Sequence, residues 1–212
     1  PQVTEKGKEE ARAAGRRINV PGFHFDAAYT SDRSRAQDTR TETLGTMNQS
    51  DVPTTVHLEL RERDYGDLVG WRRALVENIF GTVQFTKWRR GNRGDDVRPP
   101  GGENLVDVKE RAVPFFVRQI LSKIAAGKNV FISAPGNALS AILIYLTEYT
   151  QARELTEDEI VKLEVPLSTP YVVKFDEPLH HQELHVDTGK GPKDVAAFLG
   201  IEYSPKEPAQ QP

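Results

Sequence analysis

The chain has 212 residues, of which 37% are apolar, and a formal charge of −3, so it is long enough to bury one full core. This charge provides no general attraction to nucleic acid or anionic membranes, and no apolar run approaches the roughly 20 residues that a membrane helix needs. The absence of cysteine excludes disulfides, thiolate catalysis and cysteine metal sites.

We predict one domain over residues 1–203 and a proline-rich, disordered tail over residues 204–212. The chain begins Pro1-Gln2, without Met and almost at once in a predicted helix. We therefore expect either that an initiator Met was trimmed or that a longer N-terminal segment was removed or is missing from this sequence. The sequence contains no signal-peptide pattern and leaves the compartment open.

The first half of the chain alternates predicted helices and strands. Thr4 is a suitable cap for a helix over residues 5–18, and Ser31 or Asp32 for a helix over residues 33–44. Short strands are expected over residues 25–30 and 54–60, the second from its alternating apolar side chains.

A charged loop over residues 61–70 and a short helix over residues 71–80 come next, and residues 85–102 are expected to be irregular. Residues 105–126 form the longest predicted helix, with a kink at Pro114. Thr156 and Glu159 form a capping box for a helix over residues 157–163. Strands over residues 169–175 and 183–187 and a helix over residues 192–199 complete an α/β sandwich with a largely parallel sheet.

The segment Asn129–Ile144 predicts a buried strand, a tight Pro-Gly-Asn turn and an apolar helix. Such junctions lie at the carboxyl edge of a sheet, where α/β proteins bind ligands. Gly136 permits close approach of a bound group, and Asn137 can cap the helix or contact a ligand. Pro135 brings no donor, base or nucleophile.

A second strand-to-helix junction places Arg35 one turn into a predicted helix, which suits binding of phosphate or carboxylate. The alternative is that Ser31 and Asp32 are plain helix caps and that Arg35 is solvated. Glu62 lies between Arg61 and Arg63 in a glycine-punctuated loop, which suits proton transfer but is also typical of a surface ion-pair network.

The basic run Lys87–Arg90, followed by Arg93 and Arg98, favours either anion binding or a solvated loop. Stacking of Trp88 on an RNA base is a weaker alternative, because Asp95 and Asp96 neutralise the run. His180, His181 and His185 could bind a metal, but no clear fourth ligand accompanies them, and a surface cluster is the default interpretation.

In order along the chain, six stretches resemble motifs of the cofactor-dependent phosphoglycerate mutases, in the short form of that family within the histidine phosphatase superfamily. They are T-E-K-G-K-E-E-A from Thr4, A-Y-T-S-D with Arg35-Ala36, L-R-E-R-D-Y-G from Leu60, K-W-R-R from Lys87, G-E-N-L from Gly102, and V-F-I-S-A-P-G-N-A-L from Val130. The likeness covers nearly the whole chain.

The resemblance implies a phosphohistidine enzyme that uses 2,3-bisphosphoglycerate to interconvert 2- and 3-phosphoglycerate, with no metal. Glu62 matches the proton donor of the family. The expected contacts to a phosphorylated three-carbon acid are Arg35, Tyr65, Arg73, Arg89, Arg90, Gly136 and Asn137. The resemblance also implies the cytoplasm, while the sequence leaves open an organelle matrix.

Two departures from the family pattern bear on activity. The N-terminal R-H-G motif with the nucleophilic histidine is absent from this sequence, and Pro135 stands at the second histidine; Ser140 also replaces a usual arginine. Proline can neither accept a phosphoryl group nor stabilise developing charge.

Our lead prediction is a protein that has lost catalysis, keeps an anion pocket and serves as a subunit of a larger assembly. The alternative is an active mutase or related phosphatase whose N-terminal segment is missing from this sequence. The missing segment would include a central strand, so the sheet is expected to lack it or to gain it from elsewhere.

Overall fold

In the computed structural model, residues 3–90, 97–156, 159–160, 165–175 and 181–186 are described. The helices of this part are α1 (Glu5–Ile18), α2 (Ser34–Thr46), α3 (Arg73–Phe80), α4 (Thr82–Arg90), α5 (Leu105–Phe115), α6 (Ser122–Ala125) and α7 (Gly136–Gln151). Two single 3-10 turns, η1 (Leu58–Leu60) and η2 (Gly66–Leu68), and the π-helical segment η4 (Phe116–Leu121) accompany them. The strands are β1 (Ala27–Thr30), β2 (Thr54–Val56), β3 (Val130–Ser133), β4 (Tyr171–Phe175) and β5 (His181–Val186).

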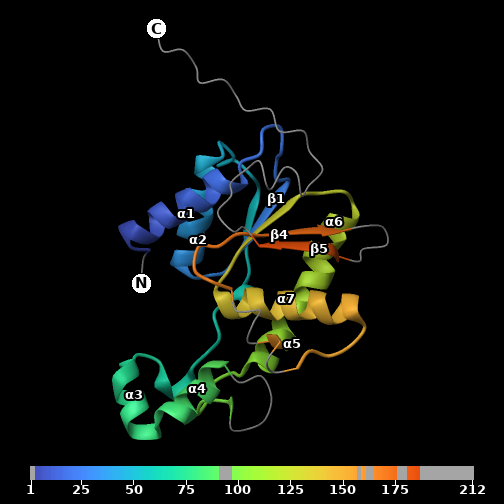
Figure 1. Cartoon of the computed structure of the whole chain (residues 1–212). Helices are drawn as coiled ribbons and strands as arrows, with labels where there is room; N and C mark the ends of the chain where they lie inside the picture. Colours follow the sequence, from blue (N-terminus) through green and yellow to red (C-terminus); the bar gives the residue numbers. More distant parts are fainter. Residues whose placement is uncertain (1–2, 91–96, 157–158, 161–164, 176–180, 187–212) are drawn as a thin grey trace.

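A parallel sheet in the order β2-β1-β3 forms the centre of the fold (Figure 1). Thr30 at the end of β1 is in register with Val56 of β2 and with Ser133 of β3. The segments that follow all three strands therefore leave the sheet at the same edge. Strands β4 and β5 form a separate antiparallel pair.

Helices cover both faces of this sheet. On one face, Ala28 packs with Ile18 of α1 and Leu44 of α2. On the other face, its neighbour Tyr29 packs with Phe115 of α5 and Ile142 of α7. This alternation of side chains along β1 explains why its sequence, Ala-Ala-Tyr-Thr, is buried almost throughout. The α/β class and the parallel sheet expected from the sequence are confirmed.

The predicted helix over residues 5–18 is present, and the Thr4 hydroxyl accepts a hydrogen bond from the Gly7 amide at 3.1 Å. The second helix differs from the prediction because Arg33, not Ser31 or Asp32, is its N-terminal cap. The Ser31 hydroxyl instead accepts from the Arg33 amide at 3.3 Å. This contact forms a turn before the helix and does not satisfy an amide within it.

The strand predicted over residues 54–60 is wrong in its second half. Strand β2 ends at Val56, and the single turn η1 follows. Leu60 is completely buried in the core, whereas Val56 and Leu58 are more than half exposed. The alternating pattern does not identify a strand face here, because only Leu60 contributes to the core and it does so from the turn.

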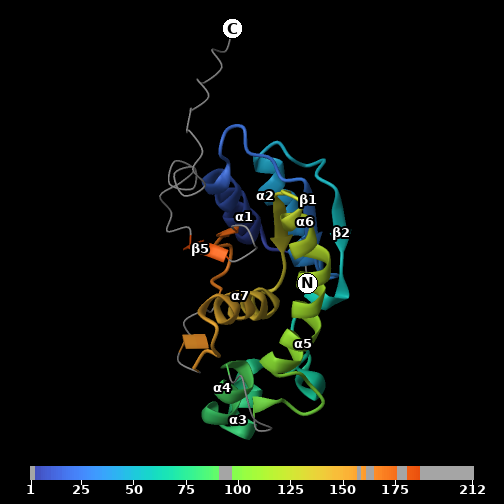
Figure 2. The same cartoon turned by 90° about the vertical axis from the view of Figure 1, so that its right-hand side faces the viewer.

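Residues 82–90 form helix α4, although the sequence was expected to be irregular from residue 85. Phe85 and Trp88, three residues apart, are buried against Leu68 and Val76. This small cluster stabilises the helix through tertiary packing, since the rest of its sequence is polar or basic apart from Val83. Figures 1 and 2 both place α3 and α4 at one end of the molecule, away from the sheet.

Pro114 lies inside α5, and the regular helix gives way two residues later to the wider π-type segment η4. Proline lacks the amide that the preceding turn needs as a donor, which accounts for a change of helix type close to this position. The predicted kink itself stays a prediction. The helices predicted over residues 157–163 and 192–199 and the tail lie wholly or largely outside the described residues. The Thr156–Glu159 capping contacts are present, with the Thr156 amide donating to Glu159 at 2.9 Å.

Two paired hydrogen bonds attach the segment after η1 to the turn before α5. The Asp64 amide donates to the Glu103 carboxylate at 2.9 Å, and the Glu103 amide donates to the Asp64 carbonyl at 2.8 Å. Burial by itself raises the pKa of Glu103, but hydrogen bonds from Arg111 and from the Asp64 amide outweigh it and hold that pKa below its usual value.

The core predicts a large effect of one truncation. Ile144 of α7 is fully buried, and Ile144→Ala should lower the free energy of unfolding by about 2–5 kcal/mol, because it removes apolar contacts and leaves a cavity. Urea unfolding followed by circular dichroism measures this change. The control Leu167→Ala, at a side chain that is 92% exposed, should stay within about 0.5 kcal/mol of the parent. Equal losses in the two variants would contradict the assigned core.

The lowered pKa of Glu103 predicts a pH-dependent contribution to stability. Its stabilisation is complete above the unfolded-state value, near 4.5, and is lost as pH falls through the lower folded-state pKa. Glu103→Gln should therefore cost on the order of 1 kcal/mol at pH 7, after allowance for solvent screening. Urea titrations from pH 7 downward should show the gap to the parent closing in acid, and a gap that is constant with pH would contradict this assignment.

Candidate functional site

Glu62 and Asn137 meet at the edge where β1 and β3 end. Asn137 Nδ2 donates a hydrogen bond of 2.7 Å to Glu62 Oε1, although the two residues are 75 positions apart in the chain. Arg35 Nη2 lies 4.0 Å from Glu62 Oε2. A carboxylate, an amide donor and a guanidinium therefore lie together, each from a different segment.

The strand order explains why these segments meet. Arg35 is the second residue of α2, which follows β1, and Asn137 is the second residue of α7, which follows β3. β1 and β3 are parallel neighbours, so both helices start at the same sheet edge. The buried Ser133 hydroxyl also donates to the Ala36 carbonyl at 2.8 Å, which joins the end of β3 to the start of α2.

The start of α7 carries the turn singled out in the sequence. Pro135 is the N-terminal cap and makes no side-chain capping bond, and Gly136 is the first helical residue. The Asn137 side chain does not cap the helix, since it donates to Glu62. The first amides of a helix lack partners within it, so the start of α7 presents backbone donors next to Asn137.

Glu62 is held by its own neighbour as well. Its Oε1 accepts from the Arg63 amide at 2.9 Å, and its side chain is 22% exposed. Arg63 itself is buried and reaches away from the site, with Nη2 donating to the Arg89 carbonyl at 2.8 Å and to the Tyr65 hydroxyl at 3.0 Å. Arg63 therefore connects the Glu62 segment to the end of α4.

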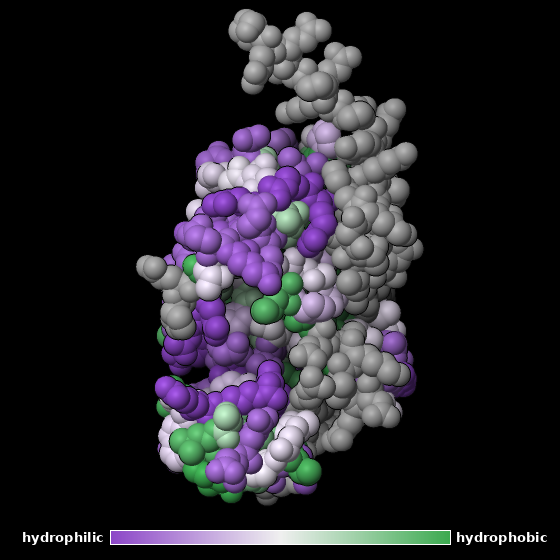
Figure 3. Space-filling view, turned by 60° about the vertical axis from the view of Figure 1, so that its left-hand side comes forward, coloured by the Kyte–Doolittle hydropathy of each residue, from purple (hydrophilic) through white to green (hydrophobic). Residues whose placement is uncertain are grey.

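The basic side chains of α3 and α4 lie around the small apolar cluster. Arg73 pairs with Glu77, four residues on, and its guanidinium lies 5.4 Å from the Phe85 ring centre. The exposed Arg89 lies 5.9 Å from the same ring. The side chain of Arg90 lies outside the described residues. Figure 3 shows a hollow with a largely hydrophilic rim between this end of the molecule and the body that carries the sheet.

Of the predicted site residues, the structure thus brings Glu62, Arg35, Gly136 and Asn137 together. Tyr65 joins them indirectly through Arg63. Arg73 instead contacts Glu77 and the Phe85 ring, and Arg89 lies against the same ring. Arg111 was missed, because it lies within an amphipathic helix whose pattern gives no signal for a polar role. Trp88 is buried and leaves no free ring face for an RNA base.

Histidine and metal chemistry are absent from this group of side chains in the described part of the chain. His57, whose side chain is described, packs 4.3 Å from the Phe115 ring and 5.8 Å from the Tyr29 ring. No set of three or more His, Asp or Glu side chains in the described ranges could hold a metal ion. The side chains of His180, His181 and His185 are not among those that the structure describes. Among the described helices, none has the length and apolarity to cross a membrane.

Comparison with known proteins identifies the family. The profile of the histidine phosphatase superfamily (branch 1) matches residues 1–174. A 2,3-bisphosphoglycerate-dependent phosphoglycerate mutase from Bradyrhizobium diazoefficiens is 39% identical over 176 residues, covering 83% of this chain and 81% of the relative. A protein of the same name from Methylobacterium radiotolerans is 40% identical over 176 residues, covering 83% and 79%.

Solved structures show the same fold. The α-ribazole phosphatase from Shigella flexneri superposes with a TM-score of 0.69 at 18% identity, covering 88% of this chain and 84% of that one. A mycobacterial glucosyl-3-phosphoglycerate phosphatase gives a TM-score of 0.66 at 20% identity, covering 88% and 85%. The family profile and the two mutases agree with the α/β architecture, and the chain belongs to the histidine phosphatase superfamily, branch 1.

Proposed function

We propose that this protein binds a small phosphorylated acid and acts as a 2,3-bisphosphoglycerate-dependent phosphoglycerate mutase or a related phosphatase. The observation that carries the proposal is the meeting of Glu62, Asn137 and Arg35 at the edge where β1 and β3 end. The names of the curated relatives, at 39–40% identity, support the mutase activity. They favour this function over the loss of catalysis that the sequence first suggested.

In this proposal the arginine and the helix start bind the anion. Arg35 supplies a guanidinium for phosphate or carboxylate, and its side chain is 52% exposed and so accessible to a ligand. The first turn of α7, with Gly136 and Asn137, offers backbone amides to the same anion. Tyr65, Arg73, Arg89 and Arg90 remain further candidate contacts, by resemblance to the family.

Glu62 is the proposed proton donor. In phosphoryl transfer the bond between phosphorus and the substrate oxygen breaks, and that oxygen needs a proton as it leaves. The hydrogen bond from Asn137 orients one carboxylate oxygen, and the other faces Arg35. The phosphoryl group would pass to a histidine nitrogen, which the family resemblance places in a motif outside this sequence.

Pro135 supports a second candidate function. It stands where the resemblance places a second histidine, and a pyrrolidine ring has no N–H to donate and cannot stabilise charge on the transferred group. The second candidate is a protein that binds the same phosphorylated acid without transferring phosphate, as a subunit of a larger assembly.

We also propose that the central layer takes a further strand between β3 and β4, which is missing from this sequence or supplied otherwise, and that residues 1–203 form one domain with a tail over residues 204–212. β3 is at the edge of its sheet and β4 at the edge of the other. Val172 of β4 packs on one core cluster while Val173 packs on the other, as a strand of the central layer does.

Binding of 3-phosphoglycerate by the full natural protein tests the anion site. Arg35→Met should weaken the affinity roughly 10- to 100-fold, since a charge-assisted hydrogen bond to the ligand is lost. Isothermal titration calorimetry measures the dissociation constant. The matched control is Arg153→Met, which removes an exposed arginine paired with Glu159 and should leave the affinity unchanged. Similar affinities in the parent and in Arg35→Met would contradict the assigned site.

The role of position 135 decides between the two candidates. With the full natural protein, mutase activity in an assay coupled to enolase should rise on the order of 10²-fold in Pro135→His, because an imidazole again stabilises the transferred group. Glu62→Gln should abolish this activity. If the parent already turns over and Glu62→Gln removes its activity, the second candidate is eliminated. If Pro135→His binds 3-phosphoglycerate but stays inert, the mutase proposal fails.

A further inference from the structure

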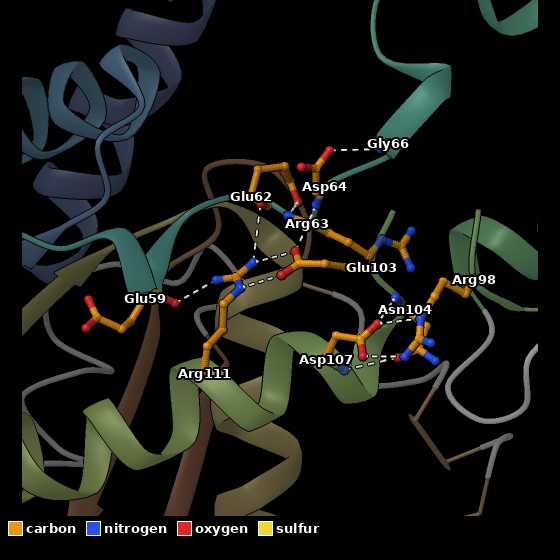
Figure 4. Close-up of polar contacts among 10 residues, drawn as sticks. All are labelled: Glu59, Glu62, Arg63, Asp64, Gly66, Arg98, Glu103, Asn104, Asp107 and Arg111. Carbon is orange, nitrogen blue, oxygen red and sulfur yellow. Dashed lines mark hydrogen bonds and ion pairs between the residues drawn. The ribbon is translucent and has the colours of Figure 1, made fainter. Parts of the chain in front are cut away.

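Arg111 of α5 makes an unusually complete set of contacts beside Glu62 (Figure 4). Its Nε and Nη2 donate to the two carboxylate oxygens of Glu103 at 2.9 and 3.0 Å. Its Nη1 donates to the Glu59 carbonyl at 2.7 Å, and Nη2 also donates to the Glu62 carbonyl at 3.3 Å. The side chain is only 19% exposed.

These contacts fix the main chain of the segment that carries Glu62. One planar guanidinium joins α5, the turn before it and residues 59–62. The Glu103 carboxylate also binds Asp64, two residues after Glu62, because it accepts a hydrogen bond of 2.9 Å from the Asp64 amide. Residues 59 and 62 are therefore held from α5, and residue 64 from the turn that precedes it.

Arg111 reaches the carbonyl of Glu62 and leaves its carboxylate to other partners. The carboxylate accepts from Asn137 and from the Arg63 amide and faces Arg35. Arg111 can thus set the position of Glu62 without neutralising its charge. A residue that acts in this way influences the site only through Glu62.

A second arginine–carboxylate pair at α5 shows what is particular to Arg111. Arg98 forms a bidentate pair with Asp107, as Arg111 does with Glu103. Asp107 belongs to the capping box of α5 with Asn104. The Arg98–Asp107 pair therefore supports the start of the helix, and Arg111 additionally contacts the segment of Glu62.

We propose that Arg111, together with Glu103, is a positioning residue that holds the main chain of Glu62 so that its carboxylate meets Asn137 and a bound phosphorylated acid. The part that concerns the acid rests on the function proposed above. The part that concerns the Glu62–Asn137 contact is independent of it, and the two are tested separately.

The first measurement needs no ligand. In ¹⁵N–¹H spectra of the full natural protein, Glu62→Gln should displace the side-chain amide signals of Asn137, because their acceptor changes. Arg111→Met should displace the same signals by a comparable amount, and the control Arg98→Met should leave them in place. Unmoved Asn137 signals in a folded Arg111→Met protein would overturn the proposal.

If Arg111→Met does not fold, the Asn137 side-chain amide signals are measured in Arg111→Lys and Glu103→Gln instead. Lysine keeps the charge but loses the planar fork, so it should displace the Asn137 signals in part. Glu103→Gln keeps one acceptor oxygen and should give a smaller displacement in the same direction. If the Asn137 signals of both variants match those of the parent, the proposal is likewise overturned.

The second measurement uses 3-phosphoglycerate in calorimetry, with the four proteins of a double-mutant cycle. If Arg111 acts through Glu62, then Arg111→Met changes the dissociation constant in the parent but has less than about a twofold effect in the Glu62→Gln background. Equal effects in both backgrounds would refute action through Glu62. If no protein binds the ligand while the Asn137 signals respond as expected, the positioning role stands and the proposed function fails.

Discussion

The hydrogen bond from Asn137 to Glu62 is the contact on which the candidate site depends. It joins an irregular segment after η1 to the start of α7, and both partners are largely shielded from water. A carboxylate that is 22% exposed needs donors to offset lost hydration, and the Asn137 amide, the Arg63 amide and the nearby Arg35 charge provide them. Without these donors, the partly buried carboxylate of Glu62 would lose hydration with no compensating hydrogen bonds.

The parallel pairing of β1 and β3 makes that contact possible. Thr30 and Ser133 are in register, so the segments that follow them start side by side. Helix α2 then brings Arg35, and helix α7 brings Asn137, to one edge of the sheet. Two faces of β1 packed against different helices hold this register, because a slip of one residue would exchange Ala28 with Tyr29 between the two cores.

The end of the molecule formed by α3 and α4 has its own small core, distinct from the two core clusters that pack on the sheet. Leu68, Val76, Phe85 and Trp88 bury one another there, while Leu75 and Ile79 of the same hairpin remain exposed. Arg63 is the buried link between this end and the Glu62 segment through the Arg89 carbonyl. Arg63 therefore connects Glu62 to the end of α4 without itself facing the ligand side of the site.

The sequence by itself determined the α/β class and the helix over residues 5–18 with its Thr4 cap, because propensity and capping act locally. The family resemblance also placed Arg35, Glu62 and Asn137 in one expected site. Only the tertiary structure decided through which contacts these three meet, that residues 82–90 are helical, and that Arg111 supports Glu62. Each of these features depends on partners from distant segments, and no local pattern of residues encodes which distant partner a side chain will meet.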